Sequence, residues 1–269
     1  MTREERFDTP EPIRLRLEAS AGQIKVETTD GAETEVSLAP LNDNDASRQA
    51  VEAARIELRS GELVVDVPDQ RSFGISFGRK AEVLLRVRCP HGSTAAVKSR
   101  SADIEGRGSY AAADVATTSG DVEWEDVAGD ATFNSVSGDL RVGSVGGRAT
   151  VQTVSGDARL GRGGGPLRAQ TVSGDLSVHE ASGPVSAKTV SGDVDLESVE
   201  GGEVEVNSVS GDLRVGIKRG SRLAVDATAV SGDLASEIDL GDAAAAGEEG
   251  PLVELRARSI SGDLRVVRA

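Results

Sequence analysis

The stretch from Val151 to Asp175 reads VQTVSGDARLGRGGGPLRAQTVSGD, and the five letters TVSGD stand at 153–157 and again at 171–175. The Ser-Gly-Asp phrase recurs every 18 residues, and the spacing lengthens to 19, 21 and 30 residues toward the C-terminus. A second glycine lies halfway along each regular interval, so the basic unit has nine residues and opens on glycine. The phrases begin at Ser119, Ser137, Ser155, Ser173, Ser191, Ser210, Ser231 and Ser261.

Apolar residues occupy fixed places in each nine-residue unit. They follow the opening glycine by two and four residues, as Leu140 and Val142 follow Gly138, with a polar residue between them. This alternation is typical of a strand with one buried face, whereas a helix would need a period of 3.6 residues. A third apolar residue comes seven places after the glycine, and the step of three before it predicts a bend. We expect these third residues to point inward as well: Val127, Val136, Val145, Val154, Val172, Ala181, Val190 and Val199.

The repeat therefore predicts an all-β fold, a parallel β-solenoid with about 18 residues per coil built from two nine-residue halves. Only 2% of the residues are aromatic, which suits a narrow interior with about 10 Å between facing sheets. Trp124 and Phe133 lie close together at the start of the regular repeat, so we expect a thicker core there.

The N-terminal part, residues 1–90, is predicted to be a β-rich cap, with strands within 13–38, 55–67 and 81–89 and one short helix at 46–54. Such a cap would cover the unpaired edge of the first coil. Residues 70–79 are expected to form a flexible connection. Residues 91–269 are the predicted solenoid region, continuous with the cap and interrupted by a loose acidic loop at 241–250.

Charge and composition exclude several classes of protein. The net charge of −15 argues against a nucleic-acid binder, because affinity for phosphate depends on clustered Lys and Arg. No segment approaches the roughly 20 apolar residues of a membrane span, and the charged start, Met1–Phe7, does not resemble a signal peptide. We therefore expect a cytoplasmic protein. Cys89 is the only cysteine, so an intramolecular disulfide is not possible.

The aspartates that follow the corner glycines are predicted to stack one per coil, about 4.8 Å apart. Like charges at that distance repel by roughly 1 kcal/mol in water, so something must offset the repulsion. One interpretation is a bound Ca²⁺ ion; the other is hydrogen bonding to turn N–H groups or to the neighbouring Ser hydroxyl. The second is favoured because the Gly-Gly-x-Gly-x-Asp loop of calcium-binding β-rolls is missing, so we expect no metal and no cofactor. The ladder comprises Asp139, Asp157, Asp175 and Asp193, with Asp121 and Asp212 beyond them.

Other repeated side chains have two interpretations each. The Ser and Thr ladders either form a flat hydroxyl surface for a repetitive ligand or satisfy the corner backbone, and we favour the second. Arg141 and Arg159 could bind an anion or simply be solvated. His91 and His179 are far apart in sequence and lack the ligand spacing of a zinc site, so we assign no catalytic residue. The hydroxyl ladders comprise Ser137, Ser155, Ser173 and Ser191, and Thr153, Thr171 and Thr189.

The phrase at Thr153–Asp157 and Thr171–Leu176 resembles that of a bacterial family of adhesin-like, β-strand-repeat domains of unknown function. The resemblance extends from about Ile13 to Val266 and implies a β-solenoid without known catalytic residues.

Three functional hypotheses follow. The favoured one is a non-catalytic scaffold or interaction module that binds a protein or a polymeric ligand. The second is a self-assembling cytoskeletal element, a homo-oligomer joined through the C-terminal edge strand Leu264–Val267. The third is a carbohydrate-active enzyme. A continuous apolar patch on one outer face would favour the interaction module.

Overall fold

The computed structural model describes residues 2–68, 81–238 and 250–269. The chain divides into two compact units, Met1–Asp139 (unit 1) and Leu140–Ala269 (unit 2). The expected connection at 70–79 and, except for Gly250, the expected acidic loop at 241–250 lie outside the described residues. The boundary expected near residue 90 stays a prediction.

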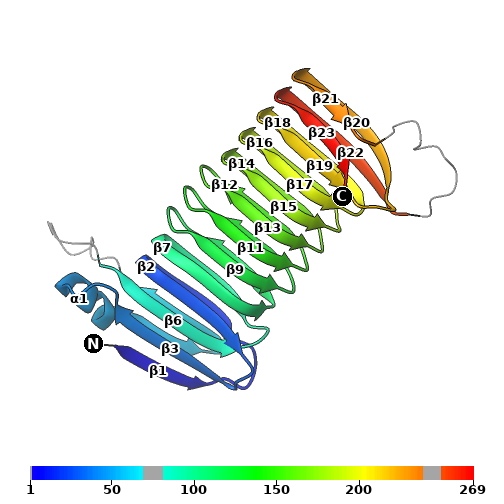
Figure 1. Cartoon of the computed structure of the whole chain (residues 1–269). Coiled ribbons are helices and arrows are strands. Elements are labelled where there is room, and N and C mark those ends of the chain that lie inside the picture. The colour runs from blue at the N-terminus through cyan, green and yellow to red at the C-terminus, as the bar shows by residue number, and fades with distance from the viewer. Residues whose placement is uncertain (1, 69–80, 239–249) are drawn as a thin grey trace. The chain divides into compact units, whose positions relative to one another are not determined.

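Unit 2 is built of coils, and each coil contributes one strand to each of two facing walls (Figure 1). Strands of one wall pair in parallel, and up to Val199 neighbouring strands are offset by 18 residues, as Leu140 with Ala158 and Val151 with Ala169. The predicted parallel β-solenoid with its 18-residue coil is therefore confirmed. The first wall contains β11 (Leu140–Val145), β13 (Ala158–Gly163), β15 (Leu176–Ala181), β17 (Val194–Val199), β19 (Leu213–Ile217), β23 (Leu264–Arg268) and β21 (Leu234–Ser236). The second wall contains β12 (Ala149–Thr153), β14 (Leu167–Ser173), β16 (Val185–Ser191), β18 (Gly202–Ser210), β22 (Leu252–Ser261) and β20 (Arg222–Ser231).

The third apolar residue of each nine-residue unit points inward in the first wall only. Val145 is 1% exposed there, and Ala181 and Val199 are also buried, as is Val127 of unit 1. In the second wall the expectation is wrong: Val154, Val172 and Val190 are 42%, 47% and 49% exposed, and the preceding Thr is buried instead. Val136 of unit 1 is exposed in the same way.

The reason is that the second-wall strands continue their alternation without a bend. The inward places after Ala149 are therefore Val151 and Thr153, and Val154 faces outward. Burial of Thr153 costs little because its hydroxyl accepts the N–H of Gly156 at 3.1 Å.

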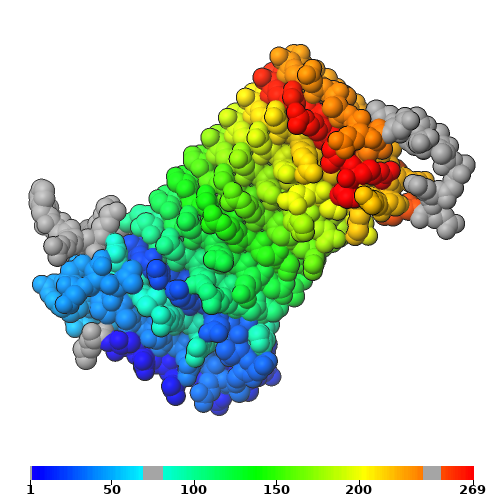
Figure 2. Space-filling model, viewed as in Figure 1, coloured from blue at the N-terminus to red at the C-terminus, as the bar shows by residue number. Residues whose placement is uncertain are grey.

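The last coils are not stacked in chain order. After β19 the chain forms the outermost coil, β20 and β21, and then returns to place β22 between β18 and β20 and β23 between β19 and β21 (Figure 1). In Figure 2 the red C-terminal strands lie between the yellow and the orange strands. The expected uncovered edge at Leu264–Val267 is therefore wrong, because that strand is paired on both sides.

The inward residues of β22 are consistent with this order. Leu255 and Ser259 lie opposite Val204 and Ser208 of β18, so the Ser at the corner is repeated. The corresponding residue of β20 is Ala229, which has no corner hydroxyl.

Unit 1 is organised around two long strands that each take part in both of its walls. β2 (Arg14–Thr29) and β7 (Thr94–Tyr110) pair in parallel over almost their whole length. At Gly22, which has a φ of 112°, an added Cβ would lie 2.0 Å from the Val83 oxygen. One wall, called here the β1–β9 wall, contains β1 (Arg3–Asp8), β3 (Glu33–Pro40), β6 (Val83–Pro90), β2, β7 and β9 (Val122–Val127). The other contains β4 (Arg55–Arg59), β5 (Glu62–Val67), β2, β7, β8 (Ala112–Ala116) and β10 (Ala131–Asn134).

The N-terminal part has the predicted β-rich composition with one short helix, α1 (Asp45–Ala53). The Asn44 side chain caps this helix by accepting the N–H of Ser47 at 2.7 Å. The helix contacts β3 and β6 of one wall and β5 of the other, and it buries Ala50 and Val51. Strand β1 was not expected, because its sequence REERFD has no apolar alternation.

The core of unit 1 is thick around Trp124 and Phe133, as their place in the sequence predicted. Trp124 lies 6.2 Å from Phe133 and 4.7 Å from Tyr110 between ring centroids. Gly106 faces the Trp124 ring, and a Cβ there would come within 2.4 Å of it. The Tyr110 hydroxyl donates to the Val26 carbonyl at 2.9 Å, which satisfies its polar end.

Candidate functional site

The aspartate ladder is held together by hydrogen bonds between coils. In unit 2 the spatial order is Asp157, Asp175, Asp193, Asp212, Asp263 and Asp233, and each Oδ1 accepts the backbone N–H of the next aspartate at 2.7–3.1 Å. In unit 1, Asp121 accepts from Asp139 in the same way at 2.9 Å. These N–H groups offset part of the repulsion between the carboxylates. Among the described residues, no group of three or more His, Cys, Asp or Glu is placed to hold a metal ion.

The buried Thr and Ser hydroxyls three residues before the glycine of a Ser-Gly-Asp phrase, called here the corner hydroxyls, are hydrogen-bonded in some coils and not in others. In three corners the hydroxyl accepts the N–H of the glycine three residues later: Thr117 with Gly120, Ser135 with Gly138 and Thr153 with Gly156. From Gly174 onward the glycines of the Ser-Gly-Asp phrases have φ values of 131–136°. The N–H groups of four of them, Gly174, Gly192, Gly211 and Gly262, donate to a serine carbonyl of the neighbouring coil. The hydroxyls of Thr189, Ser208 and Ser259 are buried and make no hydrogen bond within the described parts of the chain. The threonines therefore do not form an outer hydroxyl surface, whereas the serines of the Ser-Gly-Asp phrases are exposed.

An exposed apolar column runs along the second wall of unit 2. We name it the valine column; its members are 42–77% exposed, and each follows a buried Thr or Ser except Val230, which follows Ala229. Parallel pairing keeps them in register, because the flanking Thr189 and Ser191 lie opposite Ser208 and Ser210. The column consists of Val154, Val172, Val190, Val209, Ile260 and Val230, in spatial order.

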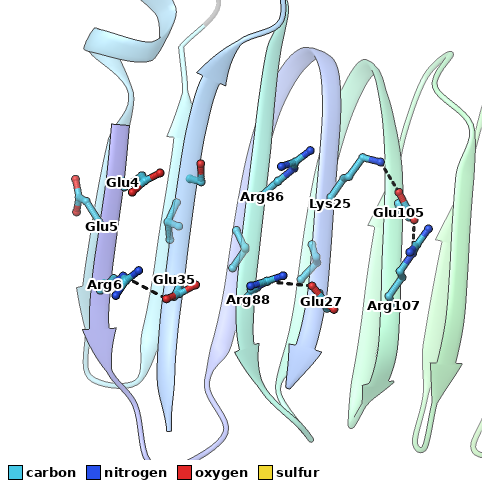
Figure 3. A pocket seen from close by; sticks show the side chains of 14 residues that line it. Glu4, Glu5, Arg6, Lys25, Glu27, Glu35, Arg86, Arg88, Glu105 and Arg107 are labelled. Carbon is cyan, nitrogen blue, oxygen red and sulfur yellow. Dashed lines mark hydrogen bonds and ion pairs between the residues drawn. The ribbon is translucent and has the colours of Figure 1, made fainter. Parts of the chain in front are cut away.

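A hollow of about 440 Å³ lies on the outer face of the β1–β9 wall of unit 1 (Figure 3). One row of side chains across it alternates in charge, because residues that face each other on neighbouring strands have opposite signs. Arg6 pairs with Glu35 at 3.2 Å, and Arg88 pairs with Glu27 at 3.0 Å.

The second row across the hollow contains a cation, Arg86, that has no ionic partner in the described part of the chain. Lys25 pairs with Glu105 at 2.8 Å, and Arg107 pairs with the same carboxylate. The hydrogen bond from Lys25 is the main reason that the pKa of Glu105 is lowered. Arg86 lies between Ser37 and Lys25 and forms no ion pair with any residue that the structure describes. The hollow could therefore accept a carboxylate or another anionic group at Arg86.

The other predicted residues are dispersed. His91 lies by Thr28 in unit 1, with Nδ1 2.7 Å from its Oγ1, and His179 lies by Glu197 in unit 2 at 2.7 Å. Arg141 lies opposite Arg159 on β11 and β13, and Arg159 also pairs with Asp157 at 3.2 Å. Sequence reasoning missed the hollow because its charges come from five strands, between residues 4 and 107. Over the described residues, no helix is long and apolar enough to cross a membrane.

Comparisons with known proteins give the following similarities. A family model described as Toastrack DUF4097 matches residues 18–182 and, in a second match, residues 167–266. The chain is similar to the solved structure of a putative adhesin from Bacteroides fragilis, with 9% identity, a TM-score of 0.43, and coverage of 99% of this chain and 97% of that one. It is also similar to a putative lipid binding protein from Parabacteroides distasonis, with 12% identity, a TM-score of 0.39, and coverage of 100% and 96%. No curated protein matches the chain. Because the two matches to the family model together span nearly the whole sequence, the chain belongs to the Toastrack DUF4097 family.

Proposed function

We propose that the protein is a non-catalytic β-solenoid scaffold, an adhesin-like interaction module that binds a protein or polymeric partner through an outer face. The observation that carries this proposal is the valine column. Exposed aliphatic side chains that stand singly need no explanation, but a contiguous row of them favours a contact surface. The row presents one aliphatic group per coil, about 4.8 Å apart.

The chemistry of the repeat supports a role without catalysis. The Oδ1 atoms of the ladder aspartates from Asp157 to Asp263 accept backbone N–H groups of the next coil, and the Thr153 hydroxyl accepts one within its own corner. Every corner repeats its neighbour, so none is set apart as a reaction centre.

The test uses a variant that keeps the shape of the column but not its apolarity. In Val172→Thr/Val190→Thr/Val209→Thr, each valine is replaced by an isosteric residue with a hydroxyl. The matched control is Val185→Thr, on the same wall but buried, and it reports the cost in stability alone. Proteins captured from a bacterial lysate by each variant are quantified by mass spectrometry, and a captured partner is then purified and titrated by calorimetry.

The proposal predicts at least one partner whose affinity falls tenfold or more with the triple variant while the fold is retained. If every captured protein binds the wild type and the triple variant equally, the valine column is not the contact surface and the proposal is wrong.

A further inference from the structure

The outermost coil of unit 2 has an open edge. Strand β20 pairs with β22 on one side only within the described residues, and Arg222 donates its N–H to the Pro251 carbonyl at 2.9 Å. Because successive residues of a parallel strand turn their N–H and C=O groups to opposite sides, the groups of Leu223, Val225 and Ala227 face away from β22. They form an edge that another strand could join.

The inward side chains of this coil are also incompletely covered. On β22 the side chains of Leu255, Ala257 and Ser259 are buried. The residues paired with them on β20 are only half-buried: Val225, Ala227 and Ala229. On β21, Leu234 is 49% exposed. The apolar interior of unit 2 therefore reaches solvent at this end.

The edge strands of unit 1 are different. β1 has Arg3, Glu4, Glu5 and Arg6, and β4 has Arg55, Glu57 and Arg59. Charged side chains on an edge strand oppose pairing with another chain. Helix α1 also closes the interior between β3 and β5 there. Strand β21 has no charge, and β20 has only Arg222 and Asp226.

These two charges make β20 complementary to itself. The N–H and C=O groups that face the open edge of β20 belong to odd-numbered residues. In an antiparallel pair of β20 strands, an odd-numbered residue must therefore lie opposite an odd-numbered residue of the other copy, so that the numbers of any two opposed residues have an even sum. A register centred on Ala224 satisfies this condition and exchanges hydrogen bonds between Leu223 and Val225 of the other copy. The same register places Arg222 directly opposite Asp226, twice, in the non-hydrogen-bonded pairs where side chains are closest. A register centred on Asp226 would instead oppose the two aspartates.

Both side chains are available for this contact. Arg222 and Asp226 are exposed, and neither takes part in a salt bridge within the described chain. Among the described residues the Arg222 side chain donates one hydrogen bond, from Nε to the Gly250 carbonyl at 3.2 Å, which leaves both terminal nitrogens for an acidic partner.

We propose that two copies of this chain join through the edge of β20, antiparallel and centred on Ala224, to form a closed two-fold dimer. The contact is isologous, since each copy uses the same strand, so it ends at two copies and does not grow into a filament. The charged edges β1 and β4 do not offer a second site of this kind. The interface is short, and the dimer forms and dissociates with concentration.

Charge exchange tests the register. Arg222→Asp places aspartates opposite each other in a dimer of that variant, and Asp226→Arg places arginines opposite each other. A mixed pair of the two variants is complementary again, because each strand then meets the opposite charge. Mass is measured by light scattering behind size exclusion over a concentration series, with circular dichroism to verify the fold. Arg168→Asp, on a strand in the middle of unit 2, is the charge-matched control.

We expect the wild type and the control to double in mass from 27.8 kDa as concentration rises. Each single variant should stay monomeric at concentrations where the wild type is dimeric, and an equal mixture of the two should again double in mass. Restoration by mixing also demonstrates that both variants are folded.

Three outcomes would overturn the proposal. A wild type that is monomeric at every concentration would mean that other residues of the same chain cover β20. Growth beyond a dimer would mean a head-to-tail contact. A dimer that survives both substitutions, or variants that fail to pair on mixing, would place the contact elsewhere. None of these outcomes bears on the valine column, so the proposed function is tested separately.

Discussion

Cys89 illustrates how the interior of unit 1 controls the chemistry of a single residue. It has no exposed surface on β6, and burial raises the pKa of its thiol to about 11, although an interaction with Ser93 acts in the opposite direction. The neutral thiol, which is a poor nucleophile, is therefore the form present in the folded protein at physiological pH.

We predict that Cys89 of the native protein is not modified by a thiol-reactive disulfide reagent at pH 8, whereas the chain unfolded in guanidinium reacts with one equivalent. Between about pH 9 and pH 11 the unfolded chain releases a proton that the folded chain retains. The free energy of unfolding should consequently fall as pH rises through this range. Cys89→Ala should remove this contribution, as denaturant unfolding at several pH values would reveal. Rapid labelling of the native protein would contradict the assignment of Cys89 as a buried, neutral thiol.

At the scale of elements, the two faces of a second-wall strand have opposite sensitivity to charge. Val151 is 4% exposed and faces the interior, while Val154, three residues on, is 42% exposed and faces solvent. A carboxylate at the first place would be buried without a partner, but at the second it would remain hydrated.

Val151→Asp should therefore lower the melting temperature by about 10 °C or more, and Val154→Asp by only a few degrees. Thermal unfolding followed by circular dichroism measures both. The pair is matched, because the wall and the substitution are the same. Equal losses from the two variants would mean that the inward and outward assignments of this wall are incorrect.

Much of each element was predictable because the information is local. Gly138, Leu140 and Val142 define a corner and an alternating strand within five residues. The exposed place of Val154 was not predictable from hydrophobicity, since it depends on whether the strand bends, and here the polar Thr153 takes the inward place instead. The position of β23 and the charges around Arg86 depend on which coils become neighbours. Similar coils contain little sequence information about that choice.

At the scale of the whole molecule, the aspartate ladders should not make stability depend on calcium. The carboxylates already accept backbone N–H groups from the next coil at distances such as 2.9 Å for Asp175. We predict a melting temperature that changes by about 1 °C or less between millimolar Ca²⁺ and a chelator. A rise of many degrees would show that the folded state binds the ion.

The insertion of β22 and β23 also affects the order in which the protein can be completed during synthesis. A solenoid whose coils follow chain order can add each coil to the previous one as it leaves the ribosome. Here β20 and β21 emerge first, yet their hydrogen-bonding partners are β22 and β23, which are translated afterwards. The outermost coil must therefore wait, unpaired on that side, until β22 and β23 have also been synthesised.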